Sequence, residues 1–263
     1  MQARHKIAVA GATGRLGRHV VDVLEARGHD VVPMSRATGV DVITTHGLAE
    51  ALVGAECIVD AATGPSPDQE QATSFFTTAA RNLQAAGSRA GVGRLVMVSI
   101  IGCDRFSAGY GLAKLVHERE SRSGPIPAAI LRAAQFHEFV AQLVDWGRQG
   151  DVGYVQAMRT QLVAARTVAE ALADLATQPD LSASDATFEI AGPRVEQLVD
   201  VARMLVAHRG ESLRIEGVRN VADPDLDVYE SGALLPGPGA TLAGPTFEAW
   251  LHATPVAVGA GAR

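Results

Sequence analysis

The stretch VAGATGRLGRHVV, residues 9–21, places three glycines directly after the apolar run of residues 7–10. A G-x-x-G-x-x-G pattern between an apolar run and a segment of helical period predicts a strand, a tight loop and a helix. In such a loop Gly11 permits the bend, Gly14 lets the backbone approach a diphosphate, and Gly17 lets the helix lie close to the sheet. The pattern is also compatible with a glycine-rich turn that binds nothing.

The first half of the chain repeats this alternation of strand and helix. The expected strands are Ile7–Ala10, Asp30–Met34, Cys57–Ala61, Arg94–Ser99 and Ala128–Leu131. The expected helices are Arg15–Arg27, Gln71–Ala86, Phe136–Trp146, Thr167–Ala176, Glu196–His208 and Thr246–Leu251. Because short β-rich runs alternate with longer helical segments, we expect an α/β fold, a doubly wound parallel sheet of the Rossmann type.

The alternation loosens after about residue 133, and this suggests a division of the chain. We expect residues 1–133 to form an NAD(P)-binding Rossmann domain and residues 134–253 to form a smaller substrate-binding lobe. Residues 254–263 are rich in small side chains and are expected to be a flexible tail.

Composition limits the partners and the compartment. With 47% hydrophobic residues in 263, the chain can bury a large core. A net charge of −6 without a basic block argues against nucleic acid, and no apolar run reaches the roughly 18 residues of a membrane span. Cys57 and Cys103 provide neither a disulfide framework nor a metal site, and no leader segment is visible, so we expect a cytoplasmic protein, a monomer or a homodimer.

The glycine loop is the first part of an expected dinucleotide site. The N-terminus of the following helix offers unpaired N–H groups and a partial positive charge to an anion. The loop residues expected to contact the cofactor are Gly11, Thr13, Gly14, Arg15, Leu16 and Gly17.

The residues after the second strand favour NADP(H) over NAD(H). Ser35 and Arg36 stand where NAD-binding folds place an acidic residue, and an arginine suits a 2′-phosphate. The alternative is that Arg36 is an ordinary surface arginine.

Two further segments are candidates for the same ligand. Asp41 and Val42 stand where a third short strand would end and are expected near the adenine, unless Asp41 only stabilises a turn. The expected fourth strand ends at the small residues Ala61, Ala62 and Thr63, which would leave room for the ribose and nicotinamide. The alternative is that these residues form only a turn that terminates the strand.

The chain resembles the atypical short-chain dehydrogenase/reductases, in particular the NmrA-like NAD(P)H-binding group. The motifs that carry this resemblance are GATGRLG at 11–17, VSIIGCDR at 98–105, YGLAK at 110–114, LRAAQFHEF at 131–139 and EIAGP at 189–193. The resemblance covers nearly the whole chain. It implies a Rossmann fold and a bound nicotinamide dinucleotide, and it is compatible with both reductases and redox-sensing regulators.

Tyr110 and Lys114 are the expected acid–base pair. Four positions apart, they lie on one face of a helix, and an ammonium beside a phenol favours the phenolate. This is the tyrosine–lysine spacing of the family that the chain resembles. Lys114 is also expected to hold the nicotinamide ribose, and Ser99 is expected to hydrogen-bond the substrate carbonyl. Ser107 is an alternative to Ser99, and the pair itself is alternatively a helix-start tyrosine and a solvated lysine.

The segment after the last predicted strand of the first domain is expected to line the substrate pocket. The residues are Gln135, Phe136, His137 and Phe139. His137 is a candidate second proton donor or, alternatively, a packed histidine at a helix start. The alternating charges of residues 117–120 are interpreted as a solvated helix face.

These patterns favour an NADPH-dependent oxidoreductase that reduces a carbonyl, a quinone or a related small molecule by hydride transfer. A non-catalytic NADP(H)-binding redox sensor is the alternative from a different class. A third possibility is an isomerisation or ring-forming enzyme that retains its dinucleotide between turnovers.

Overall fold

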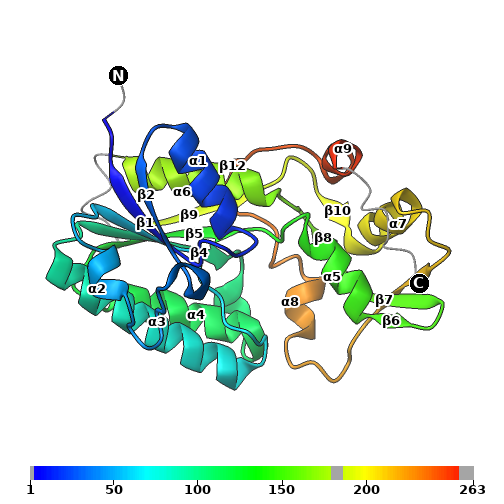
Figure 1. The fold of residues 1–263 in the computed structure, drawn as a ribbon. Coiled ribbons are helices and arrows are strands. Elements are labelled where there is room, and N and C mark those ends of the chain that lie inside the picture. Colours follow the sequence, from blue (N-terminus) through cyan, green and yellow to red (C-terminus); the bar gives the residue numbers. More distant parts are fainter. Residues whose placement is uncertain (1–2, 179–185, 255–263) are drawn as a thin grey trace, which may run out of the picture.

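A seven-stranded parallel sheet forms the centre of the protein in the computed structural model, which describes residues 3–178 and 186–254 (Figure 1). The strands are β1 (Lys6–Ala10), β2 (Asp30–Met34), β3 (Cys57–Asp60), β4 (Arg94–Ile100), β5 (Ala128–Ala133), β9 (Thr187–Ala191) and β12 (Thr241–Leu242). They lie in the order β12-β9-β5-β4-β3-β1-β2, and all neighbouring pairs are parallel. The order reverses between β1 and β3, so the expected doubly wound Rossmann sheet is confirmed.

Helices cover both faces of this sheet. Helices α1 (Gly17–Ala26) and α6 (Ala165–Thr177) pack on one face (Figure 1). Helices α2 (Leu48–Ala51), α3 (Gln69–Ala90) and α4 (Gly109–Arg122) lie on the other. Two 3-10 turns, η1 (Arg36–Thr38) and η2 (Cys103–Arg105), follow β2 and β4.

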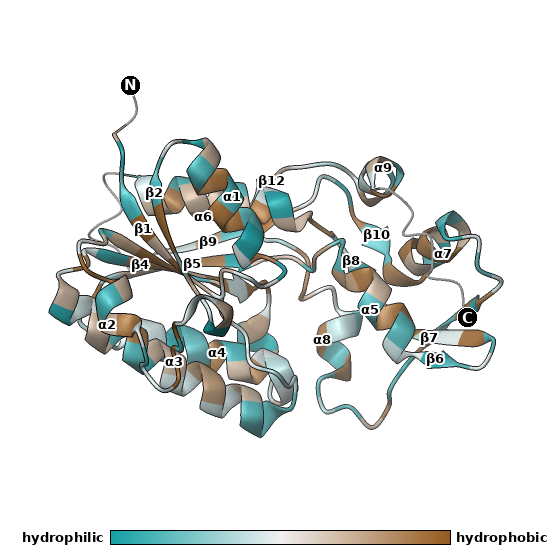
Figure 2. Cartoon of the chain, viewed as in Figure 1, coloured by the Kyte–Doolittle hydropathy of each residue, from teal (hydrophilic) through white to brown (hydrophobic). Residues whose placement is uncertain are grey.

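The two-sided cover explains why the central strands are apolar at successive positions. In β1, Ile7 and Val9 join the core beneath α1 and α6, while Ala8 and Ala10 join the core beneath α2 and α3. A parallel strand buried on both faces has no solvent side to mark with polar residues. Figure 2 shows mostly hydrophobic central strands between helices that carry both hydrophilic and hydrophobic residues.

The remaining elements gather beyond the carboxyl end of β5 (Figure 1). They are α5 (Phe139–Trp146), β6 (Arg148–Gln149), β7 (Val152–Gln156), β8 (Arg159–Thr160), β10 (Glu196–Gln197), α7 (Leu198–His208), β11 (Arg214–Val218), α8 (Leu226–Glu230) and α9 (Phe247–Ala253). Strands β11, β7 and β6 form a small sheet, β10 pairs with β8, and a separate apolar core joins α5, α7 and α9. No helix in the described ranges is long and apolar enough to cross a bilayer.

The expected third strand at Asp41 and Val42 is wrong. The Asp41 carboxylate accepts a hydrogen bond from the backbone N–H of Ile43 at 2.8 Å, and the Asp41 N–H donates to His46, so the segment makes turns between η1 and α2. A side chain that bonds its own backbone two residues on competes with strand pairing. The strand Cys57–Asp60, which we expected as the fourth, is therefore the third.

The segment after residue 133 contributes to both parts of the molecule. Strands β9 and β12 complete the main sheet, and α6 covers it, whereas the other elements form the smaller core. The functional division at residue 133 stays a prediction. The expected tail lies outside the described residues from residue 255 onward.

Candidate functional site

The glycine loop packs directly against the end of β3, at the point where the strand order reverses. Gly11 has a positive φ of 74°, and a Cβ there would lie 2.6 Å from the Ala61 carbonyl oxygen and 2.8 Å from the Ala62 Cα. A Cβ on Gly17 would lie 2.0 Å from the Gly11 carbonyl oxygen. Only glycine fits at either position, so the spacing of the motif is set by close backbone contact.

This loop presents main-chain donors. Within residues 3–178 and 186–254, the N–H groups of Thr13, Arg15 and Leu16 donate no hydrogen bond, while Gly14 donates to the Gly11 carbonyl at 2.9 Å. The loop leads into α1 at Gly17, and Thr13 and Arg15 are exposed. N–H groups that have no acceptor at the start of a helix can bind an anion.

Two predicted cofactor residues after β2 have definite positions. The Ser35 hydroxyl accepts the N–H of Thr38 and caps η1, which leaves Arg36 exposed at the start of that turn. The Arg36 guanidinium makes no ion pair or hydrogen bond with the residues that the structure describes. Val42 is buried, and its carbonyl accepts the Asn82 side-chain amide at 2.8 Å.

Tyr110 and Thr63 meet beside the end of β3. Their hydroxyl oxygens are 3.2 Å apart, and the Tyr110 ring packs edge-on against Phe76 of α3 at 5.8 Å between centroids. Burial raises the pKa of Tyr110, opposed by the hydrogen bond with Thr63. The direction is opposite to the lowering that we expected from Lys114, and it keeps the phenol protonated at neutral pH.

Lys114 belongs to a buried chain of polar groups. Its Nζ donates to the Val98 carbonyl at 2.7 Å and lies 3.0 Å from His117 Nδ1. His117 Nε2 lies 3.0 Å from the Asp60 carboxylate, and Asp60 also accepts the Ala62 N–H at 3.0 Å. Desolvation lowers the pKa of Lys114 to about 8, because burial penalises its charged form.

The interpretation of residues 117–120 as a solvated face is wrong for its first two members. His117 and Glu118 are each 1% exposed, since α4 packs closely on α3 and on the sheet. The signal was present in the sequence: residues 110, 114, 117 and 121 recur at the spacing of one helical face. Nothing local marked Asp60, which is fully buried at the end of β3, as the partner.

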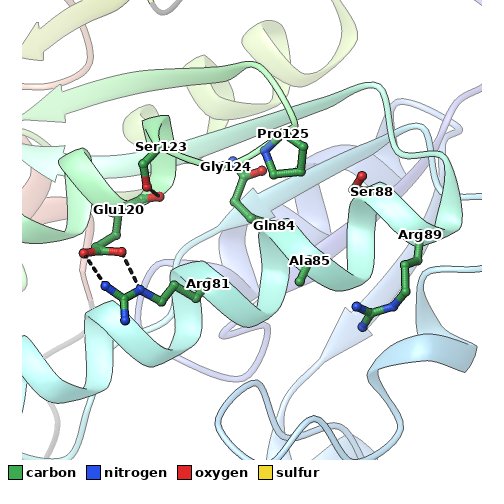
Figure 3. A pocket seen from close by; sticks show the side chains of 9 residues that line it. All are labelled: Arg81, Gln84, Ala85, Ser88, Arg89, Glu120, Ser123, Gly124 and Pro125. Carbon is green, nitrogen blue, oxygen red and sulfur yellow. Dashed lines mark hydrogen bonds and ion pairs between the residues drawn. The ribbon is translucent and has the colours of Figure 1, made fainter.

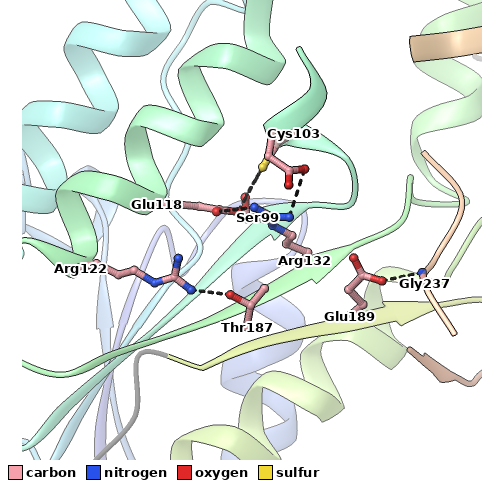
Figure 4. Close-up of polar contacts among 9 residues, drawn as sticks. Ser99, Cys103, Glu118, Arg122, Arg132, Thr187, Glu189 and Gly237 are labelled. Atoms are coloured by element: carbon pink, nitrogen blue, oxygen red, sulfur yellow. Dashed lines mark hydrogen bonds and ion pairs between the residues drawn. The ribbon is translucent and has the colours of Figure 1, made fainter. Parts of the chain in front are cut away.

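The two candidate serines make contacts of their own. Ser99 is 2% exposed, and its hydroxyl lies 3.6 Å from the Cys103 thiol, which donates to Glu118 at 3.1 Å (Figure 4). Glu118 is also held by two 2.9 Å bonds from Arg132. The Ser107 hydroxyl donates to Asp225 at 2.7 Å. In this structure neither hydroxyl joins the Tyr110–Thr63 pair, and a substrate contact of Ser99 stays a prediction.

The predicted pocket residues lie between the main sheet and the smaller core. Gln135 accepts a hydrogen bond from Thr160 at 3.0 Å, and Phe139 packs on Trp146. Phe136 pairs with Val163 through a backbone bridge and packs partly buried against the main core.

His137 lies deeper than its pocket neighbours. It is 1% exposed and packs against Phe247 and Trp250, with Nε2 3.1 Å from the Pro245 carbonyl. Burial lowers the pKa of His137 to about 4, so it is neutral at pH 7. These contacts correspond to the packed-histidine alternative rather than to a proton donor.

One surface hollow lies elsewhere. It has a volume of 530 Å³ and lies between the C-terminal parts of α3 and α4, beside the ion pair of Arg81 and Glu120 (Figure 3). These helix ends lead into the starts of β4 and β5, so the hollow is at the amino edge of the sheet. Ligands of open parallel sheets bind beyond the opposite edge, where the glycine loop lies.

Comparison with known proteins gives structural likeness only. No protein-family model matches the sequence, and no curated protein sequence matches it. TunA, an NAD-dependent NDP-hexosamine 5,6-dehydratase of tunicamycin biosynthesis, is 16% identical with a TM-score of 0.68, over 95% of this chain and 96% of that chain. The Bordetella bronchiseptica enzyme WbmG, in complex with NAD and UDP, is 16% identical with a TM-score of 0.68, over 94% and 93%.

A third similar structure is the dTDP-4-dehydrorhamnose reductase of Bacillus anthracis in complex with NADP. It is 16% identical with a TM-score of 0.65, over 84% of this chain and 87% of that chain. At these identities the likeness supports the Rossmann-type fold, and the NmrA-like assignment stays a prediction.

We predict that Asp225 stabilises the turn that leads into α4. Its carboxylate accepts the Ser107 N–H at 2.8 Å, the Ser107 hydroxyl and the Ala108 N–H at 3.0 Å. Asp225→Asn should lower the free energy of unfolding at pH 7 by about 1.5–3 kcal/mol, the range for bonds to a charged group. Urea denaturation measures this, with exposed Asp227→Asn as the control.

The pH dependence of this effect has a defined sign. Desolvation opposes ionisation of Asp225, but the three hydrogen bonds outweigh it and lower its pKa. The stabilisation is therefore complete above the ordinary aspartate value of about 3.9 and disappears as the pH falls through the lowered pKa. An equal loss of stability in the two variants at pH 7 would contradict the assignment.

Proposed function

We propose that this protein binds a nicotinamide dinucleotide in the glycine loop and acts as an NAD(P)(H)-dependent oxidoreductase on a small molecule. The single observation that carries the proposal is the contact of Gly11 with Ala61 and Ala62. This contact places the glycine loop, whose N–H groups can bind an anion, next to the end of β3. Thr63 follows that strand end and is the hydrogen-bond partner of Tyr110.

The residues fit such a cofactor. A Cβ on Gly11 would fill the approach between the loop and β3, and the N–H groups of Thr13, Arg15 and Leu16 suit a diphosphate. Beyond the diphosphate, Thr63 and Lys114 would hold the ribose and nicotinamide half. When bound, the dinucleotide would supply or accept a hydride.

In the reducing direction, Tyr110 is the proton donor. Its raised pKa keeps the hydroxyl protonated at neutral pH, so the phenol can give its proton to the oxygen of a carbonyl substrate. Lys114, which contacts the same Phe76 ring as Tyr110, would supply the positive charge that stabilises the phenolate left behind. Phe76 contacts both side chains, with Lys114 Nζ 4.6 Å from its ring centroid.

The reductase assignment agrees with the similar structures, whose cofactors are NAD or NADP. TunA supports a second candidate function, because a dehydratase that depends on NAD carries out no net redox change. In that case the dinucleotide stays bound and is regenerated in each turnover. Release of oxidised cofactor in step with product distinguishes the reductase from this alternative.

We predict that Tyr110→Phe abolishes turnover and retains cofactor binding. Loss of a positioned proton donor should lower kcat at least about 100-fold. NADPH oxidation with a panel of ketones, quinones and sugar nucleotides measures this, and the Kd for NADPH should change less than threefold. Tyr154→Phe in β7 is the matched control. Unchanged turnover would remove Tyr110 from the mechanism, and tight binding without turnover in the wild type would indicate a sensor.

We also predict that Arg36 selects NADP(H). Arg36→Ala should weaken NADPH binding by about 1–3 kcal/mol, the contribution of a charge-assisted bond, and leave NADH binding nearly unchanged. Calorimetric titration with both cofactors tests this, with exposed Arg89→Ala at the far end of α3 as the control. Equal weakening of both cofactors would refute the assignment.

A further inference from the structure

With Lys114 as an ammonium, the buried chain of Lys114, His117 and Asp60 has one consistent arrangement of hydrogens. A lysine ammonium has donors and no acceptor, so His117 Nδ1, 3.0 Å from Lys114 Nζ, accepts. The neutral imidazole then carries its hydrogen on Nε2 and donates it to Asp60 at 3.0 Å. The carboxylate therefore fixes the histidine tautomer that can accept from Lys114.

The surroundings hold these groups rigidly. The Phe76 ring stacks on the His117 ring with centroids 4.5 Å apart and planes at 11°, and the same ring contacts Lys114 and Tyr110. Asp60 and His117 are 0% and 1% exposed. The second Asp60 oxygen accepts the N–H of Ala62, whose Cα is one of the atoms closest to Gly11.

We propose that Asp60 and His117 are positioning residues that keep Lys114 charged and hold it against the Phe76 ring, which Tyr110 also contacts. The proposal rests on the function proposed above, in which the Lys114 charge acts beside Tyr110. The Asp60 carboxylate balances the positive charge of Lys114 and fixes the tautomer of His117. His117 Nδ1 accepts a hydrogen bond from Lys114. Because Asp60 also binds Ala62, the chain joins the cofactor loop to the acid–base pair.

The charge balance around Lys114 gives the proposal a measurable consequence. The groups that face Lys114 are Asp60 from β3, His117 and Glu118 from α4, and Cys103 from η2. Desolvation lowers the pKa of Lys114, while Asp60 and then Glu118 raise it. Removing the Asp60 charge should therefore lower the pKa of Lys114 further, so that a smaller fraction of Lys114 is charged at neutral pH.

Asp60→Asn tests both parts of this account. The Asn amide has one oxygen, which the Ala62 N–H retains, so its NH₂ group faces His117 Nε2. His117 must then accept at Nε2 and carry its hydrogen on Nδ1, toward Lys114. The ammonium keeps the Val98 carbonyl but loses His117 as an acceptor and Asp60 as a counter-charge.

Two further variants separate hydrogen bonding from packing. His117→Phe keeps an aromatic ring against Phe76 and removes both hydrogen bonds. His117→Gln offers an acceptor and a donor to the same neighbours and should restore much of the wild-type behaviour. A merely structural histidine would show the opposite ranking, because phenylalanine fills the site better than glutamine.

Nuclear magnetic resonance of the full chain measures the pKa of Lys114 and the tautomer of His117 without a substrate. The sequence contains two lysines, so lysine labelled with ¹⁵N at Nζ gives a signal for Lys114 and an internal reference from partly buried Lys6, which donates to the Val53 carbonyl. Histidine ¹⁵N shifts, assigned with His117→Gln, report the tautomer. We expect the Nε2–H tautomer of His117 in the wild type at pH 7, and a Lys114 pKa at least one unit lower in Asp60→Asn and His117→Phe than in the wild type.

A wild-type His117 that carries its hydrogen on Nδ1, or an unchanged Lys114 pKa in Asp60→Asn, would overturn the proposal. If Asp60→Asn does not fold, the wild-type tautomer and the comparison of His117→Phe with His117→Gln decide. These measurements need no cofactor. Absence of NADPH binding by the wild type would instead end the proposed function and leave the hydrogen-bond result intact.

In an active protein, the same variants should shift the basic limb of the pH–kcat profile. Lys114 must be charged to stabilise the Tyr110 phenolate, so a lower pKa moves the loss of kcat to lower pH, by at least one unit in Asp60→Asn. The KM for the substrate should change little. A lower kcat with an unshifted profile would indicate distorted packing and contradict positioning.

Discussion

The close contact between Gly11 and the end of β3 is the constraint on which the rest of the site depends. With 2.6 Å between a Cβ at Gly11 and the Ala61 oxygen, any side chain would force the loop away from the sheet. The contact fixes the start of α1 relative to β3, and the N–H groups of Thr13, Arg15 and Leu16 donate to none of the residues that the structure describes. It thereby aligns an anion-binding loop with the strand end that leads to Thr63 and Tyr110.

The second constraint is charge buried between the sheet and α4. Lys114 and Asp60 are opposite charges joined through His117, and Glu118 is paired with Arg132 a short distance away. Buried ions need partners with good geometry, because the interior does not solvate them. Both networks are built from β-strand ends and one face of α4, so the helix that carries Tyr110 is held by polar contacts as well as by packing.

The fold could be predicted because its signals are local. The glycine spacing after residues 7–10 and the alternation of strands with helices specify the Rossmann sheet. The expected third strand does not form, because the Asp41 carboxylate accepts the Ile43 N–H and makes a turn there. The polar chain could not be predicted: Asp60 and His117 are 57 positions apart, and the charges of residues 117–120 look solvated although the first two members are buried. Asp225, which binds Ser107 across 118 positions, gave no signal either.

A crystal structure of the protein grown with NADP⁺ tests the central claim most directly. The account predicts the diphosphate against the main chain of residues 11–17 and the nicotinamide ring beside Tyr110 and Thr63. A dinucleotide bound elsewhere, or one in the loop with its nicotinamide pointing away from Tyr110, would contradict it.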